Sequence, residues 1–263
     1  MFGLGGRQIA HGIQRKLKAT GGTITDVNIS GIDYRVHTFT SSGTFNVTSG
    51  SGDIEFVIVG AGGAGGYASN GGGGGGAGGY LSSVQGELSG RNSAALSVYP
   101  VLAGSYTITV GSGTTGQGQS SSAFGYTAIG GGAGGQSSGG SGGSGGGSGY
   151  LSPGSGTTGQ GFNGASGYNL GGDYYGGGGG GAGSGGTNGS LGSVGSGGAG
   201  ITTNISGTPT TYARGGRGTR DQALGAWAGS NGAANTGNGA IPWNYAFVTS
   251  TGGSGIVIVR YPI

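Results

Sequence analysis

Long runs of glycine set the strongest limit on how this chain can fold. Six consecutive glycines followed by Ala and Gly occur twice, within residues 71–79 and 176–183, and glycine supplies 79 of the 263 residues. Glycine has no side chain to bury, and it loses more conformational entropy on folding than any other residue. Such runs can be ordered only where their backbone N–H and C=O groups are densely hydrogen-bonded to neighbouring segments.

Large apolar side chains are concentrated in two stretches that flank a glycine-rich centre. Leu, Ile, Val and Phe number 45, and only 10 of them fall within residues 111–240. Their share, about 17%, is below the ~20% at which a single conventional core becomes doubtful. Disorder is disfavoured because only 6% of the residues are charged. We therefore expect a frame of residues 23–110 with 241–263, a glycine-rich insert at 111–240 and an N-terminal arm at 1–22.

Period-two patterns predict that the frame is built from short β-strands. One segment alternates strictly, so Tyr106, Ile108 and Val110 should share a buried face. The last segment is apolar on both faces, as is typical of a central strand covered on both sides, and we expect it to pair with the strand that contains Phe56. Ser-Gly turns should separate the earlier strands. The predicted strands are 34–39, 44–48, 54–59, 105–110 and 255–261.

A three-residue period inside the glycine stretches predicts extended left-handed helices. The polyproline II type has three residues per turn, so side chains spaced by three lie on one face. Glycine adopts this shape without Pro and lets neighbouring helices pair their backbone groups. Collagen is excluded, because it needs a sustained G-X-Y register and abundant Pro, whereas this chain has five Pro. The spaced side chains are Ser138, Ser141 and Ser144, and Arg214, Arg217 and Arg220.

No arrangement of residues indicates an enzyme, a cofactor or a metal site. The chain has no Cys, which excludes disulfides and thiolate ligands. Neither His11 nor His37 has a nucleophile or base tied to it in the sequence, and matches to G-x-G-x-x-G carry no weight in so glycine-rich a chain. Asp53 and Glu55 share a strand face, where a solvated pair is favoured over a glycosidase pair. We expect no catalytic residue and no cofactor.

Charge and hydropathy also limit the classes of partner. Four of the ten basic residues lie within the first 18 positions, and the remainder has six basic against seven acidic side chains. A basic face for nucleic acid is therefore not expected. No segment approaches the ~18 apolar residues of a membrane span, and no apolar leader is present. The sequence predicts assembly in the cytoplasm.

Several segments, taken in order, resemble the glycine-rich domain of bacteriophage tail-fibre and other virion proteins. They are FVIVGAGG at 56–63, the glycine run that ends in Tyr80, YTITVG at 106–111 and GSGIVIVRY at 253–261. The resemblance covers about residues 34–263. It implies a virion structural protein, usually a homotrimer, whose glycine-rich loops recognise bacterial surface components. The plan is also similar to the glycine-rich ectodomain of some receptor tyrosine kinases, which implies an all-β, jelly-roll-like β-sandwich with polyglycine helices.

We expect receptor-binding residues at the loop tips of the glycine insert. Flat exposed rings suit contacts with sugars or apolar groups, and a line of guanidinium groups suits phosphate or carboxylate. The alternatives are that the rings plug the bundle or fill a trimer interface, and that the arginines pair with internal acids or carbonyls. The candidates are Tyr168, Asp173, Tyr174, Tyr175, Arg214, Arg217, Arg220 and Trp227.

The N-terminal arm is predicted to be a short amphipathic helix that attaches the protein to other virion proteins. Apolar side chains at spacing i, i+4, i+8 form a narrow stripe, with basic residues elsewhere. Membrane binding by this stripe is the alternative. The candidate attachment residues are Phe2, Leu4, Ile9, Ile13 and Leu17.

Together these features predict a non-enzymatic phage structural protein. The first hypothesis is a tail fibre or receptor-binding tip that contacts a bacterial surface glycan or outer-membrane protein. The second is a passive decoration or joint protein of the capsid or tail. In both, the protein is part of the virion, assembles as a homotrimer, and neither binds nucleic acid nor inserts into a membrane.

Overall fold

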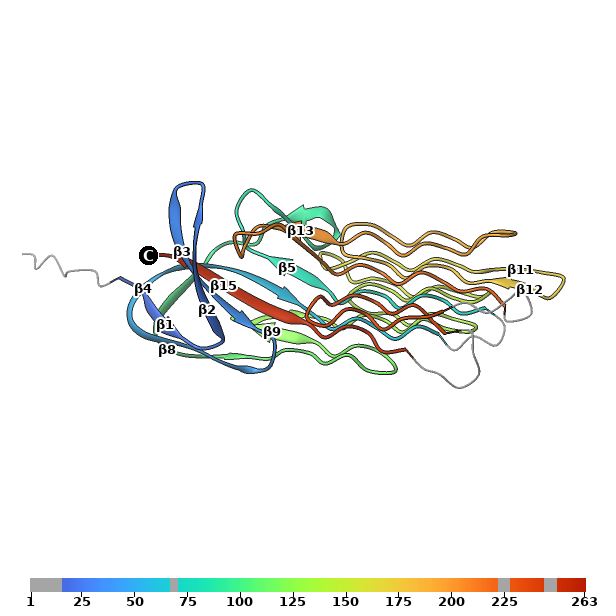
Figure 1. Ribbon diagram of the computed structural model, residues 1–263, viewed down its shortest axis with the longest axis horizontal. Helices are drawn as coiled ribbons and strands as arrows, with labels where there is room; N and C mark the ends of the chain where they lie inside the picture. Colours follow the sequence, from blue (N-terminus) through green and yellow to red (C-terminus); the bar gives the residue numbers. More distant parts are fainter. Residues whose placement is uncertain (1–15, 67–70, 222–227, 244–249) are drawn as a thin grey trace, which may run out of the picture.

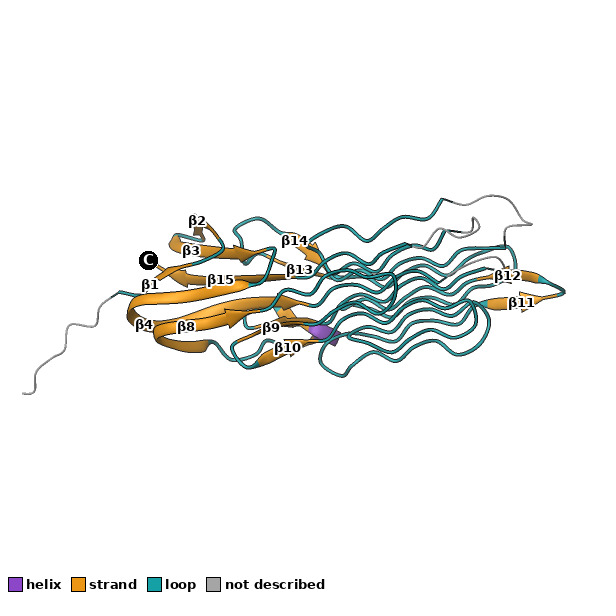
Figure 2. Cartoon of the chain, turned by 90° about the horizontal axis from the view of Figure 1, so that it is seen from below, coloured by secondary structure: helices purple, strands orange, loops and turns teal. Residues whose placement is uncertain are grey.

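The computed structural model describes residues 16–66, 71–221, 228–243 and 250–263. The molecule is elongated, with long β-strands at one end and a bundle of extended glycine-rich segments at the other (Figures 1 and 2). The C-terminus lies at the strand end, beside β1 and β4. Within the described residues the only helical element is a short 3-10 turn, η1 (Gly90–Asn92). The expected all-β class is confirmed.

Seven strands form one curled sheet in the order β1-β4-β15-β3-β2, with β5 and β8 also paired to β4. Every strand pair in this sheet is antiparallel. The predicted jelly-roll connectivity is not shown by this strand order. The sheet strands are β1 (Lys18–Thr20), β2 (Thr23–Ile29), β3 (Ile32–Phe39), β4 (Gly43–Val59), β5 (Tyr80–Ser82), β8 (Tyr99–Ile108) and β15 (Ile256–Pro262). Short two-stranded pairs are β6 (Leu88–Ser89) with β7 (Ser93–Ala94), β9 (Ser121–Ala123) with β10 (Tyr126–Ala128), β11 (Tyr168–Leu170) with β12 (Asp173–Tyr175), and β13 (Ile201–Thr203) with β14 (Thr210–Tyr212).

Strand β4 replaces two predicted strands by one. The Ser-Gly segment at 49–52 was expected to be a turn, but it is an irregularity inside a 17-residue strand, with Gly50 at φ +79°. The pairing with β8 shifts register between Val47 and Ser51. Such an irregularity bends a strand without ending it. Pairing with β8 runs through it from residue 43 to residue 54, whereas β1 pairs only before it, at 46–49, and β15 and β5 only after it, at 55–59.

Strand β15 is the central strand that its apolar pattern predicts. It lies between β4 and β3, and Val259 pairs with both Phe56 and His37. Its side chains enter two cores: Val257 and Tyr261 belong to one, while Ile256 and Ile258 belong to the other. The first core also takes Phe39, Phe45, Phe56, Val101, Ile108 and Phe124, and the second takes Val36, Val57, Tyr80, Ile201, Ile205 and Tyr212.

The end of the predicted helical arm is a strand. Leu17 and Ala19 are buried while Lys16 and Lys18 are exposed, which is period two and not a helical period. Residues 18–20 pair with β4, because Leu17 and Ala19 can then join the first core. The helical prediction is therefore wrong for residues 16–20. Its other attachment residues, Phe2, Leu4, Ile9 and Ile13, lie outside the described residues.

The first glycine run, 72–79, lies at the centre of the bundle. Every third amide donates to the same neighbour, so the run donates in turn to segments 129–135, 177–180 and 237–240. Its carbonyls accept, with the same period, from three further segments, 60–66, 144–147 and 216–219. Six surrounding segments and a period of three are what polyproline II-type helices of glycine require.

The second glycine run, 176–183, is surrounded in the same way. Its amides donate to segments 213–219, 145–148 and 184–187. Its carbonyls accept from 74–77, 162–165 and 195–198. The two runs that share the order of six glycines and one Ala are thus both internal, and the buried segment 143–148 is surrounded by six segments as well. Segments 60–66 and 72–79, which the predicted boundaries assign to the frame, run in the bundle.

Candidate functional site

The hairpin β11–β12 stands at the far end of the bundle from the C-terminus (Figures 1 and 2). Its two-residue turn is Gly171-Gly172, with φ of +65° and +101°. A turn with positive φ at both central residues matches the twist of antiparallel strands, and glycine adopts it without strain. This turn explains why the Asp-Tyr-Tyr sequence, flanked by glycine on both sides, forms a projecting tip.

Along the hairpin, burial increases sharply from the turn inward. Asp173 is exposed, Tyr174 is half-buried and Tyr175 is only 7% exposed. The ring centroid of Tyr175 lies 6.5 Å from that of Tyr168, and the ring of Tyr174 meets that of Tyr150 edge-on at 5.7 Å. Tyr175 therefore packs beneath the hairpin, whereas Asp173 and one side of Tyr174 face solvent.

Exposed leucines surround this hairpin. Leu170 is 58% exposed in β11, Leu151 is 54% exposed beside Tyr150, and Leu191 is 63% exposed in a loop next to the hairpin base. The sequence patterns do not predict a role for these leucines. Their only sequence signal is that each is a large apolar side chain alone among Gly, Ser and Asn.

The arginines at spacing three occupy one side of the segment 213–220. Gly216 and Thr219 donate inward to the central run, and Gly215 and Gly218 donate to the segment 195–198. The third side carries the arginines: Arg214 is exposed, and Arg217 and Arg220 are partly exposed. The predicted line of arginines thus exists, and the end at Arg220 adjoins the hairpin, since Arg220 and Tyr175 form a β-bridge.

A hollow of about 260 Å³ lies between this line and the loop after Leu191. Burial lowers the pKa of Arg217 below its usual range, yet a guanidinium group remains charged at neutral pH. The hollow therefore places positive charge next to hydroxyl and aromatic groups. Its lining includes Tyr175, Ser193, Val194, Ser196, Arg217 and Arg220.

Of the predicted receptor-binding residues, the structure brings together Tyr168, Asp173, Tyr174, Tyr175, Arg217 and Arg220 at this end. Arg214 is on the same line, two helical turns from Arg220. Trp227 lies outside the described residues. The attachment residue Leu17 is in the first core and only 9% exposed, so its side chain is not available for docking.

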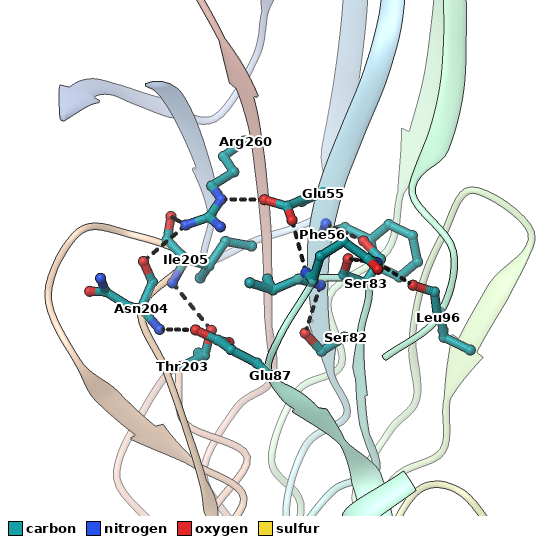
Figure 3. Close-up of polar contacts among 12 residues, drawn as sticks. Glu55, Phe56, Ser82, Ser83, Glu87, Leu96, Thr203, Asn204, Ile205 and Arg260 are labelled. Carbon is teal, nitrogen blue, oxygen red and sulfur yellow. Dashed lines mark hydrogen bonds and ion pairs between the residues drawn. The ribbon is translucent and has the colours of Figure 1, made fainter. Parts of the chain in front are cut away.

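A cluster of polar contacts lies where the sheet meets the bundle (Figure 3). Arg260 Nε donates to Glu55 Oε2 at 2.6 Å, and Arg260 Nη1 donates to the Asn204 carbonyl at 3.1 Å. The Asn204 amide donates to Glu87 Oε1, and the Gln85 amide donates to Glu55 Oε1. The cluster ties two loops to β4 and β15, so it holds the fold together.

Neither a cluster of metal ligands nor a membrane-spanning helix is found in the described residues. Within residues 16–66, 71–221, 228–243 and 250–263, no three His, Asp or Glu side chains gather as metal ligands would. Over the same ranges, no helix has the length and apolar character needed to cross a membrane.

The family model of the glycine-rich domain matches residues 39–262. This chain belongs to that family. The match takes in most of both cores, both central glycine runs and the hairpin, while Leu17, Ala19 and Val36 of the cores precede it. Comparison with curated proteins gives no match to this chain.

Proposed function

We propose that this chain is a non-enzymatic bacteriophage structural protein, a tail fibre or receptor-binding tip that recognises the host cell surface. The observation that carries the proposal is the polarity of the molecule. The sheet lies at one end, and the hairpin β11–β12 with exposed Asp173, Leu170 and Leu191 lies at the other. A hydrogen-bonded glycine bundle between them is a stiff spacer.

This arrangement suits recognition because the scaffold and the contact surface are separate. Loops on a rigid scaffold can vary without disturbing the fold, and turn residues such as those at 171–173 face open space or solvent. Exposed leucines and a half-exposed tyrosine offer apolar contact, and the arginine line offers charge. The partner proposed is a bacterial surface glycan or an outer-membrane protein.

The test is binding of the purified, fluorescently labelled protein to intact host cells, with extracted surface glycans as competitors. The double variant Leu170→Ser, Asp173→Ser changes two exposed side chains, and we expect adsorption to fall at least ~10-fold, equivalent to about 1.4 kcal/mol. The matched control is Leu102→Ser, since Leu102 is 69% exposed but lies in β8 at the other end. Unchanged adsorption in the double variant, or an equal loss in the control, would contradict the proposal.

The alternative function is a passive decoration or joint protein. It is favoured by the internal packing of several tip rings, such as Tyr175 on Tyr168. Under this alternative the folded, assembled protein joins particles but does not bind cells. In both functions we propose a virion location after assembly in the host cytoplasm, a homotrimer, and residues 1–15 as the attachment segment.

A further inference from the structure

The hollow between Arg217, Arg220 and the 192–196 loop has the chemistry of an anion site. We propose that it binds one phosphate or carboxylate group carried on a sugar ring. Its role in host recognition rests on the function proposed above, whereas the binding itself does not.

The backbone geometry explains why two guanidinium groups reach one hollow. In a polyproline II-type helix each residue advances ~3.1 Å, so residues three apart share a face and lie about 9 Å apart along the axis. Long side chains from Arg217 and Arg220 span that separation, and both line the hollow. Arg214 lies one turn further away, is exposed, and is not part of the lining.

The opposite wall of the hollow is the 192–196 loop, which contributes neutral residues and a turn. Ser193 and Ser196 are part of the lining, and Ser193 Oγ donates to the Val194 carbonyl at 3.5 Å. Gly192 turns the chain at φ +79°. The turn is closed by reciprocal backbone hydrogen bonds between Ser190 and Ser193, each 2.9 Å. This wall is therefore preorganised, which reduces the entropy lost when a ligand binds.

The size of the hollow and its two arginines select the ligand. At about 260 Å³ it is slightly smaller than the ~300–1,000 Å³ of ordinary small-molecule pockets, so it suits a single charged sugar unit. Tyr175 also lines the hollow but is only 7% exposed. Guanidinium groups bind phosphate and carboxylate oxygens in pairs of parallel hydrogen bonds, and the partial desolvation that lowers the pKa of Arg217 strengthens attraction to an anion.

Two acids belong to the segments that border the hollow. Asp221 follows Arg220 directly, and its amide donates to the Tyr174 carbonyl at 3.0 Å. Asp173 is exposed in β12. An internal carboxylate that pairs with the guanidinium groups weakens the binding of an external anion. Asp221→Asn should therefore leave the affinity for the anion unchanged or increase it.

The probes are glucose 6-phosphate and glucuronate, with glucose as the neutral control, and binding to the full chain is measured by calorimetry. We expect millimolar binding of a charged sugar, none of glucose, and weaker binding as NaCl rises from about 0.05 to about 0.5 M. Glucose 6-phosphate alone identifies a phosphate site, glucuronate alone a carboxylate site, and both a general anion site. Binding of neither charged sugar overturns the proposal.

The matched variants are Arg217→Gln and Arg220→Gln against Arg214→Gln. We expect affinity to fall at least ~10-fold in the first two and to stay unchanged in the third. Equal losses in all three would mean general surface charge and would overturn the site. Should Arg217→Gln or Arg220→Gln fail to fold, amide shifts of the unmodified protein decide: they must change at Ser193, Val194 and Ser196.

Host-cell adsorption separates this site from the proposed function. Sugar binding that depends on Arg217 and Arg220, without adsorption to any host, leaves the anion site standing and removes the recognition role. Adsorption that survives Arg220→Gln, where that variant no longer binds the sugar, supports the tip but removes this site from recognition.

Discussion

At the residue scale, the central glycines are required by contacts on every side. A Cβ on Gly74 would overlap the carbonyl oxygen of Gly216, and one on Gly76 would overlap that of Ser144. These are backbone atoms of neighbouring helices and cannot rotate away. The exceptions are Ala77 and Ala182, which are fully buried where the bundle meets the second core and touch apolar side chains.

Gly74→Ala should therefore destabilise the protein strongly. Overpacking costs about 1–3 kcal/mol in ordinary cores, and we expect the upper part of that range here because the overlapped atom belongs to the backbone. Urea unfolding of Gly74→Ala against Gly116→Ala measures this, since a Cβ at Gly116 meets open space. Equal stability of the two variants would mean that the bundle is loosely packed.

The buried His37 predicts a dependence of stability on pH. Its Nδ1 lies 2.8 Å from the Gly21 carbonyl, so that nitrogen carries the proton, and Nε2 lies 3.4 Å from the Tyr261 hydroxyl. Burial lowers the pKa of His37 below 6.5, although the Gly21 hydrogen bond opposes the shift, and Arg35 lowers it further while Asp26 opposes. As the pH falls, His37 is therefore protonated in the unfolded chain before it is protonated in the folded chain.

Stability should be complete above pH 6.5 and should fall as the pH decreases below that value. The melting temperature between about pH 7.5 and 5 measures this. His37→Gln should unfold at lower temperature but lose most of the pH dependence in this window. Asp26 does not interfere, because hydrogen bonding to Arg35 holds its pKa below 3.8. A melting temperature that rises toward pH 5 would contradict the assignment.

At the element scale, one irregular segment and one ion pair decide the fold of the sheet. The 49–52 segment bends β4 and lets one strand serve two halves of the sheet. The Arg260–Glu55 pair then fixes β15 to β4 and holds the loop at Asn204. Side-chain exposures of 8% and 16% show that this pair is largely removed from water.

Arg260→Met should destabilise the protein by about 3–5 kcal/mol, because it leaves the Glu55 carboxylate buried without its partner. The control is Arg35→Met, which breaks the Arg35–Asp26 pair, with side-chain exposures of 34% and 48%. An exposed pair of this kind contributes about 0–1 kcal/mol. Denaturant midpoints of both variants test the difference, and similar losses would show that the Arg260 pair is not effectively buried.

At the scale of the whole molecule, the bundle turns a glycine-rich chain into a rod with two distinct ends. Segments far apart in the sequence supply the six neighbours of each central run. Because these contacts join segments far apart in the sequence, the three-residue period identifies the helices but does not predict how they are arranged. The sheet closes the rod, since β15 returns to β4 across about 200 residues.

Local sequence patterns were sufficient to predict the elements in which side chains on one face share the same surroundings. Alternation at Tyr106 and Ile108 predicted their shared core, the two-sided apolar run at 256–259 predicted a central strand, and spacing by three placed the arginines on one face. The same reasoning failed at Leu17, because three apolar residues at helical spacing do not reveal that the last of them pairs with β4.

The sequence by itself determined that the chain would be all-β with glycine helices, because chain stereochemistry and the absence of side chains leave few ways to satisfy the backbone. Only the tertiary structure decided which glycine runs are internal, that Tyr175 is packed while Leu170 and Leu191 are exposed, and that two of three arginines share a hollow. Those outcomes depend on contacts between segments distant in the chain, which no local spacing encodes.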